Sequence, residues 1–245
     1  MAVVPYKNSE ASKKKQVAEM FDNISAKYDF LNHVLSFQVD KYWRRKTIKL
    51  LKKYPHEIIL DVATGTADFA IAARKANPQK VVGIDISEGM LEVGRVKIEK
   101  KKLSRMIELQ VADSENLPFN DAAFDVAVAG FGVRNFESLE KGLAEVKRVL
   151  KKGGRFFILE FSKPESGLFR FFYQFYFKRI LPLIGRIVSK DKSAYTYLHD
   201  SVGAFPSGKE FEKIMEQTGY CNIESIPLTF GIATIYVGQK PDSSK

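Results

Sequence analysis

Cysteine and histidine are scarce in this chain of 245 residues, which contains one cysteine and three histidines. The single thiol, Cys221, excludes a disulfide within the chain and favours a reducing compartment. The histidines lie far apart in the sequence, at positions 33, 56 and 199, so they form no metal-ligand spacing. We therefore expect neither a stabilising disulfide nor a metal site.

Long apolar runs are also missing. No stretch reaches the roughly 18 residues that a membrane-spanning helix needs. Residues 1–16, MAVVPYKNSEASKKKQ, have neither the apolar core of a signal peptide nor the arginine-rich character of a transit peptide. We therefore expect a cytoplasmic protein.

Positive charge is abundant. Lys and Arg number 39 against 29 Asp and Glu, which gives a formal net charge of +10. Such a balance suits RNA, DNA or an anionic membrane surface. Lysine-rich, solvated helices explain it equally well, so charge alone does not choose a partner.

Apolar patterning predicts an α/β fold. Residues 12–53 show helical spacing, and short apolar strands then alternate with amphipathic helices. One of these helices is expected over residues 138–154, closed by two glycines. The alternation predicts a doubly wound, mostly parallel sheet, and the two apolar runs near the C-terminus predict an antiparallel hairpin. The expected strands are residues 57–62, 80–86, 107–113, 124–131 and 155–162.

Four segments follow from this pattern, within one domain overall. They are a helical N-terminal cap (1–54), an α/β core (55–165), an aromatic-rich insertion (166–205) and a helix and hairpin that complete the core (206–245).

Acidic residues end three of the predicted strands. Ligands of an open parallel sheet bind beyond the carboxyl ends of its strands, where Asp61, Asp85 and Asp113 fall. The small residues of the turn 63–67 allow the backbone to approach a ligand closely. Asp85 can accept hydrogen bonds from both hydroxyls of a ribose, and Asp113 can accept one from an adenine amino group. The pattern predicts an adenosine site, although each acid by itself could merely cap a helix or end a strand.

Phosphate-binding motifs are absent. The dinucleotide fingerprint G-x-G-x-x-G is reduced to Gly65, and no P-loop motif occurs. Three carboxylates suit an adenosine that carries a positive centre better than one that carries phosphates. S-adenosylmethionine, a sulfonium without phosphate, meets both conditions.

Several longer motifs then narrow the prediction. The chain resembles the class I S-adenosylmethionine methyltransferases, with their Rossmann-like fold, and among them the ubiquinone/menaquinone C-methyltransferase family. The most specific matches are FGVRNF, LEFSKP and YTYLHDSVGAFP. The motifs occur in the family's order at residues 26–45, 60–68, 83–91, 112–119, 131–136, 159–164 and 195–206.

The resemblance implies a set of cofactor residues in addition to Asp61. Thr66 matches a contact near the amino-acid end of the cofactor, Asp85 the ribose ligand, and Asp113 with Ser114 the adenine side. Ala63 and Ala67 replace glycines of many relatives, and alanine fits such a turn well only where φ is negative. The complete predicted set is Asp61, Gly65, Thr66, Asp85, Asp113, Ser114 and Gly130.

The implied reaction is methylation of a ring carbon on a reduced, polyprenylated quinone. Arg134 could hold the phenolate or orient a water molecule, or it could form a structural ion pair with a strand-end acid. Asp29, from the N-terminal helices, could accept the hydroxyl proton or cap a turn. We expect catalytic roles for Arg134, Asp29 and Tyr197, and substrate contacts for Tyr28, Asn135, Tyr195 and His199.

The aromatic- and arginine-containing stretch 167–188 suits an interfacial element at an anionic membrane, or a plain core helix under the cap. We expect demethylmenaquinol as substrate and a peripheral membrane surface as partner, without nucleic acid. A homodimer is compatible with the sequence. The alternatives are a ubiquinone precursor, RNA or another small molecule as substrate, and a non-catalytic subunit that binds an adenosine ligand.

Overall fold

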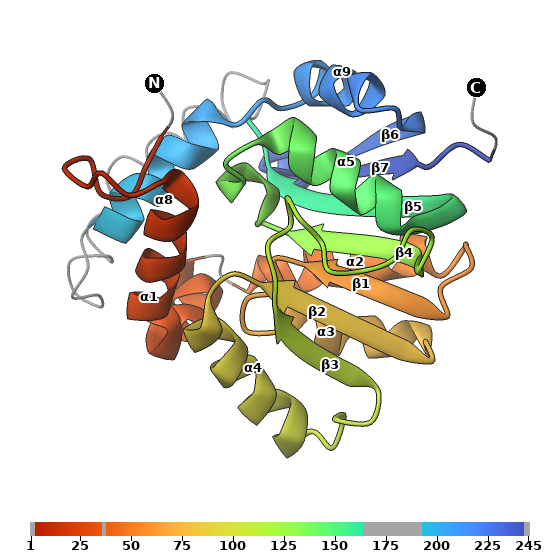
Figure 1. The fold of residues 1–245 in the computed structure, drawn as a ribbon, viewed down its shortest axis with the longest axis horizontal. Helices are drawn as coiled ribbons and strands as arrows, with labels where there is room; N and C mark the ends of the chain where they lie inside the picture. Colours follow the sequence, from red (N-terminus) through yellow and green to blue (C-terminus); the bar gives the residue numbers. More distant parts are fainter. Residues whose placement is uncertain (1–2, 36–37, 164–192, 243–245) are drawn as a thin grey trace.

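The structure, a computed structural model, describes residues 3–35, 38–163 and 193–242. A seven-stranded sheet in the order β3-β2-β1-β4-β5-β7-β6 forms its centre (Figure 1). The strands are β1 Ile58–Val62, β2 Lys80–Asp85, β3 Ile107–Val111, β4 Phe124–Gly130, β5 Leu150–Phe161, β6 Cys221–Leu228 and β7 Ala233–Gln239.

Strands β1 to β5 pair in parallel, and β7 joins β5 and β6 antiparallel. The predicted doubly wound sheet with a C-terminal antiparallel hairpin is therefore confirmed. The chain reverses its direction of winding between β1 and β4, so the ends of these strands form the switch point at which ligands of such sheets bind.

Two apolar layers cover the sheet. One contains side chains of α2 (Val39–Leu51), α3 (Asp68–Ala73) and α4 (Glu88–Lys100), and the other contains side chains of α5 (Leu139–Val149) and α9 (Lys209–Gln217). Trp43 and Phe69 are buried in the first layer, Leu143 and Phe211 in the second. Because both faces are covered, the central strands are apolar on both sides, which explains their continuous hydrophobic runs.

Helices α1 (Lys13–Leu35) and α8 (Ser193–Ala204) lie together at one end of the molecule (Figure 1). Val17 and Met20 of α1 pack with Ala194 and Tyr197 of α8 in a small separate cluster. This cluster joins the predicted N-terminal cap to the only part of the predicted insertion that lies within the described residues. The remainder, including residues 167–188, lies outside them.

Two predicted helices differ in the structure. The helical region 12–53 divides at Gln38, whose φ of 61° is left-handed and cannot continue a helix. The helix predicted over 138–154 ends at Val149, and its glycines lie in β5 instead. Leu150 pairs with Phe124 of β4 and is fully buried, so sheet formation there prevails over glycine capping.

Among the described residues, no helix is both long and apolar enough to cross a membrane. In the same part of the chain, no three His, Cys, Asp or Glu side chains are grouped as metal ligands.

Candidate functional site

The turn after β1 is strained. Ala63, Gly65 and Ala67 have φ angles of 53°, 54° and 64°. The condition that the alanines keep negative φ is therefore not met, and each adopts a conformation that is costly for a residue with a Cβ atom. The turn is held in place because the Gly65 amide donates to Asp85 Oδ2 at 2.8 Å and the Thr64 amide donates to the Ile84 carbonyl at 2.8 Å.

Asp61 lies beneath this turn and is fully buried. The hydroxyl of Thr64 donates to its Oδ2 at 2.6 Å, and burial raises the pKa of Asp61 to about 7. Asp61 does not line the cavity described next, so the structure places it as a support of the turn.

A cavity opens at the carboxyl ends of β1, β2 and β4, between the turn and α1. Seven of the sequence-predicted site residues line it: Tyr28, Gly65, Asp85, Asp113, Ser114, Gly130 and Asn135. Apolar side chains complete its wall, among them Val17, Phe21, Ile86, Met90 and Phe136. The structure therefore brings most of the predicted cofactor residues to one place.

The two acids in this cavity have different surroundings. Asp85 is held by the amides of Gly65 and Ser87, and burial raises its pKa. Asp113 accepts from Lys14 Nζ at 2.6 Å, and the same ammonium group lies 3.5 Å from Glu115. The first turn of α1 therefore reaches over the predicted adenine side of the cavity.

The adjacent Lys13 reaches a different loop. Its ammonium group donates to the carbonyls of Phe136 at 2.6 Å and Arg134 at 3.3 Å. These carbonyls belong to the 3₁₀ turn η2 (Val133–Asn135) and the residue after it. Neighbouring lysines of α1 thus hold two of the loops that surround the cavity.

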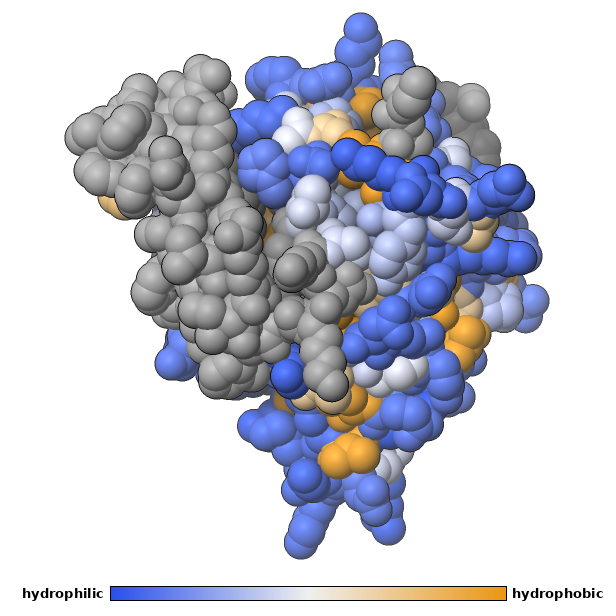
Figure 2. All heavy atoms as spheres, turned by 90° about the vertical axis from the view of Figure 1, so that its left-hand side faces the viewer, coloured by the Kyte–Doolittle hydropathy of each residue, from blue (hydrophilic) through white to orange (hydrophobic). Residues whose placement is uncertain are grey.

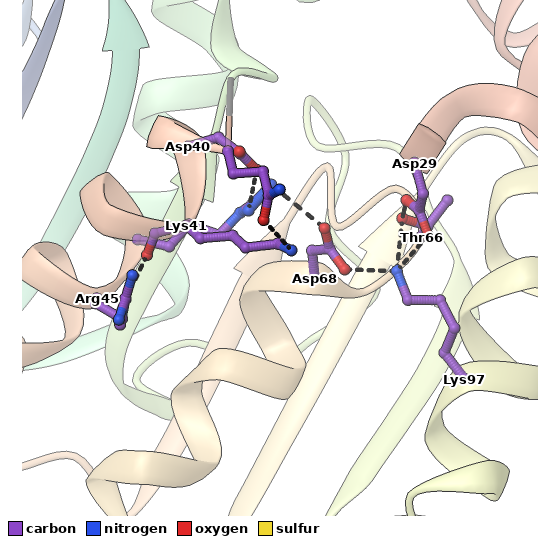
Figure 3. A network of polar contacts seen from close by, with 9 residues as sticks. Asp29, Asp40, Lys41, Arg45, Thr66, Asp68 and Lys97 are labelled. Atoms are coloured by element: carbon purple, nitrogen blue, oxygen red, sulfur yellow. Dashed lines mark hydrogen bonds and ion pairs between the residues drawn. The ribbon is translucent and has the colours of Figure 1, made fainter. Parts of the chain in front are cut away.

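Asp29 and Thr66 belong to a polar network whose ion pairs join α1, α2, α3 and α4 (Figure 3). Thr66 Oγ1 donates to Asp29 at 2.5 Å, and Lys97 of α4 lies 2.7 Å from Asp29 and 2.5 Å from Asp68. Arg44 of α2 extends the network to Asp68. Asp29 and Thr66 do not line the cavity; they lie behind its turn, where Lys97 binds the Asp29 carboxylate.

A second group of predicted residues forms a buried polar cluster beside the cavity. The side chain of Arg134 is 6% exposed, and its Nη1 lies 2.9 Å from Glu160 Oε1 on β5. Tyr197 of α8 is 3% exposed. Arg134 Nε, Asn135 Oδ1 and the Tyr197 hydroxyl are buried without a hydrogen-bond partner among the described residues. Arg134 therefore forms the ion pair with a strand-end acid that the sequence suggested. The polar atoms without a partner in the described structure can still bind a ligand.

The remaining predicted substrate residues lie elsewhere or outside the description. His199 is exposed on α8, and its Nδ1 lies 3.1 Å from Asp200. The side chain of Tyr195 lies outside the described part of the chain. Tyr28 lines the cavity and packs edge-to-face on Phe21, with ring centroids 5.9 Å apart.

Sequence reasoning missed four residues of this region: Lys13, Lys14, Lys97 and Glu160. Glu160 had a signal, since it lies within the motif LEFSKP that carried the resemblance. The lysines had none, because nothing in a lysine-rich helix distinguishes an ammonium group that reaches a distant loop from one that is solvated.

The residues of the cavity fit S-adenosylmethionine. Asp85 and Asp113 provide acceptors for ribose hydroxyls and an adenine amino group, and Ile86 and Met90 provide apolar walls for a flat ring. Among the described residues, Lys14 is the single basic side chain that lines the cavity, and carboxylates engage it. A phosphate-bearing ligand would find no cradle there.

Comparison with solved structures agrees with this fold. A SAM-dependent methyltransferase from Thermotoga maritima superposes with a TM-score of 0.64 over 91% of this chain and 99% of that one, at 19% identity. The [4+2]-cyclase SpnF superposes with a TM-score of 0.63 over 95% and 98%, at 15% identity. Because the second is named a cyclase, the shared architecture shows the fold and not the reaction.

Sequence comparison is more specific. The chain is 44% identical to a demethylmenaquinone methyltransferase of Bacteroides fragilis, over 97% of both chains. It is 48% identical to a ubiquinone/menaquinone biosynthesis C-methyltransferase UbiE of Geotalea daltonii, over 93% of this chain and 97% of that one. The sequence model of the ubiE/COQ5 methyltransferase family matches residues 9–240. The predicted resemblance, the methyltransferase activity and S-adenosylmethionine as cofactor are thereby confirmed, and the chain belongs to the ubiE/COQ5 methyltransferase family.

Proposed function

We propose that this chain methylates a ring carbon of demethylmenaquinol, forming menaquinol, with S-adenosylmethionine as methyl donor. The observation that carries the proposal is the buried polar cluster beside the cofactor cavity. Arg134 Nε and the Tyr197 hydroxyl can donate, and Asn135 Oδ1 can accept, yet none has a partner among the described residues. A quinol carries two hydroxyl groups, each of which can donate and accept, and can therefore provide partners for such atoms. The name of the Bacteroides fragilis relative supports the same substrate.

The cofactor, when bound, supplies an electrophilic methyl group on a positive sulfur. The chain's own residues prepare the acceptor carbon. A quinol becomes nucleophilic at the carbon next to a hydroxyl when that hydroxyl gives up its proton, so the site must stabilise negative charge on oxygen. Arg134 is fixed and nearly fully buried, which makes its positive charge more effective than it would be in water.

Tyr197 is suited to donate a hydrogen bond rather than to act as a base. Burial raises its pKa to about 12, with Glu160 adding to the rise and Arg134 opposing it. At neutral pH its hydroxyl therefore keeps the proton. Asn135 lines the cavity, and in this proposal it orients the quinol ring.

Asp29 has a different part in this proposal. Its carboxylate binds Lys97 and Thr66 behind the turn, outside the cavity lining. We assign it to the attachment of α1 to the cofactor turn, in place of the proton-accepting role considered from the sequence.

The substrate assignment is tested by competition among acceptors. The wild-type protein is incubated with methyl-labelled S-adenosylmethionine and equal amounts of reduced short-tail demethylmenaquinone, a reduced ubiquinone precursor of equal tail length, and RNA. We expect label mainly in the naphthoquinol. Preference for the ubiquinone precursor would replace the substrate, as the name of the Geotalea daltonii relative allows. Label in RNA alone would contradict the proposal.

We further propose that the protein works at the cytoplasmic surface of a membrane, because its substrate carries an isoprenoid tail. The net charge of +10 favours anionic lipid. Hydrophilic side chains predominate on the described surface of the side shown in Figure 2, and we expect attraction by charge to contribute to the binding. Sedimentation with anionic vesicles at low salt should exceed that with neutral vesicles, and equal sedimentation would contradict this proposal.

The homodimer and the four-segment division stay predictions.

A further inference from the structure

Glu160 lies in β5 and is fully buried. It does not line the cofactor cavity, but it forms an ion pair with Arg134, on which the proposed chemistry depends. A buried carboxylate is costly unless its oxygens are hydrogen-bonded and its charge is compensated. The contacts that meet this cost indicate its role.

Three hydrogen bonds hold the carboxylate. Arg134 Nη1 donates to Oε1 at 2.9 Å, the Phe161 amide donates to Oε1 at 2.9 Å, and the Arg134 amide donates to Oε2 at 3.4 Å. Glu160 therefore holds both the main chain and the guanidinium group of Arg134. Because β5 is an inner strand of the sheet, this anchor is rigid.

These bonds engage one of the three nitrogens of the Arg134 guanidinium group. Nη1 is occupied by Glu160 and by the Phe131 carbonyl. Nε is buried without a partner among the described residues, as is the hydroxyl of Tyr197. The guanidinium cannot turn to present another edge without breaking the ion pair with Glu160.

We infer that Glu160 is a positioning residue of the methyl-transfer site: it fixes Arg134 with the Nε side turned to the quinol oxygen, and its negative charge sets the pH at which that oxygen ionises. The inference rests on the proposed function, since it takes the quinol oxygen as the ligand of Arg134. A merely structural ion pair would stabilise the fold without affecting the ionisation of the substrate.

The variants Glu160→Gln and Glu160→Asp separate these roles. Glutamine removes the negative charge while keeping the shape, whereas aspartate keeps the charge on a shorter side chain. Asp125→Asn is the matched control, because Asp125 also accepts a main-chain amide (Ile58) and pairs with a cation (Lys151), but it lies at the start of β4. Initial rates on reduced short-tail demethylmenaquinone are measured from pH 5 to 9, with S-adenosylhomocysteine affinity measured in parallel.

For Glu160→Gln we expect kcat to fall about 10- to 100-fold, with the KM for quinol and the affinity for S-adenosylhomocysteine within about threefold of wild type. The rising limb of the kcat profile should move to lower pH by about one unit, because the nearby negative charge that opposes ionisation is gone. Glu160→Asp should restore the wild-type pH profile and part of kcat. Asp125→Asn should leave the profile unchanged.

An unchanged kcat in Glu160→Gln, or a loss equal at every pH, would overturn the inference. A second measurement, the hydrogen-exchange rate of the Arg134 Nε proton, does not need the substrate. Its ¹⁵N–¹H signal is assigned by its absence in Arg134→Lys. We expect this proton to exchange slowly in wild type and at least tenfold faster in Glu160→Gln. Slow exchange in both would overturn the anchoring role. If wild type methylates no quinol, the proposed function fails, and the exchange measurement still decides whether Glu160 fixes Arg134.

Discussion

Arg134 combines a buried ion pair with an N–H group that has no partner in the described structure, so charge and hydrogen-bond geometry can be separated by substitution. Arg134→Lys keeps the positive charge and loses the planar fork, whereas Arg134→Ala loses both and leaves Glu160 buried without its counter-ion. We expect kcat to fall about 100-fold or more in both variants, comparable to removing one oxyanion donor.

The affinity for S-adenosylhomocysteine checks this prediction by calorimetry. It should stay within a few-fold of wild type in Arg134→Lys, because Arg134 does not line the cavity. Arg95→Ala, which removes a partly exposed arginine of α4 outside the cavity lining, serves as control and should keep full activity. Wild-type kcat in Arg134→Lys would reduce Arg134 to a structural residue.

A substitution at Ala63 should stabilise the fold. Its φ of 53° is left-handed, which costs an L-residue about 1–2 kcal/mol, and glycine avoids that cost. Ala63→Gly should therefore raise the free energy of unfolding by about 1 kcal/mol in a urea titration. Ala72→Gly, in the regular helix α3, should lower it by about 1 kcal/mol. A loss of stability in both variants would show that the turn is not strained at Ala63.

Among single residues, the acids at strand ends could be predicted because each lies at the end of a short apolar run that is visible in the sequence. Gly65, Asp85 and Asp113 accordingly line one cavity. The sequence did not reveal Lys14, whose partner Asp113 lies 99 positions away. Such pairs depend on how helices are arranged in space, which periodicity does not encode.

Among the elements, α1 makes polar contacts with the cofactor turn and α4 in addition to its apolar cluster with α8. Lys97 bridges the carboxylates of Asp29 and Asp68 (Figure 3), while Arg44 contacts Asp68 from the other side. Lys97→Met should lower the free energy of unfolding by about 1.5–3 kcal/mol, the range for hydrogen bonds to charged groups. Lys100→Met, exposed on the same helix, should cost little.

Hydrogen exchange of the α1 amides measures the effect of Lys97→Met on this helix. The amides of α1 should exchange faster in Lys97→Met than in wild type or Lys100→Met, because the attachment of α1 is weakened. A double-mutant cycle with Asp29→Asn should give a coupling of about 0.5 kcal/mol or more. Unchanged protection of α1, together with additive effects, would show that the network does not hold this helix.

The elements also show where periodicity misleads. The helix predicted over 138–154 ends at Val149, because Leu150 is buried in the sheet beside Phe124. Two glycines after a helical run suggested a cap, but here they lie in a strand. Strands β1, β2 and β4 agree with the prediction to within one residue, since a buried parallel strand has a distinctive continuous apolar run. The edge strand β3, which carries Glu108 and Gln110, ends two residues earlier than predicted.

For the whole molecule, buried carboxyl groups predict how stability depends on pH. Asp61 is fully buried, with a pKa raised to about 7, whereas an unfolded aspartate titrates near 3.9. The folded state therefore binds this proton more tightly. The stabilisation is complete below about pH 4 and is lost as the pH rises to about 7, a change of about 4 kcal/mol.

Urea titrations of wild type and Asp61→Asn between pH 4 and 8 test this expectation. The asparagine side chain has no charge to bury and keeps an oxygen that can accept from Thr64. Relative to wild type, Asp61→Asn should gain stability as the pH rises, by up to about 4 kcal/mol. Parallel curves for the two proteins would show that Asp61 is not protonated in the fold.

Transfer of the methyl group to a ring carbon of the quinol, with Arg134 required, can be tested directly in one measurement. Wild type and Arg134→Ala are incubated with ¹³C-methyl-labelled S-adenosylmethionine and reduced short-tail demethylmenaquinone, and the product is examined by ¹³C NMR. We predict a single labelled methyl bonded to a ring carbon in wild type and almost none in Arg134→Ala. A labelled methoxy group, or no labelled quinone from a wild-type protein that binds the cofactor, would contradict the account.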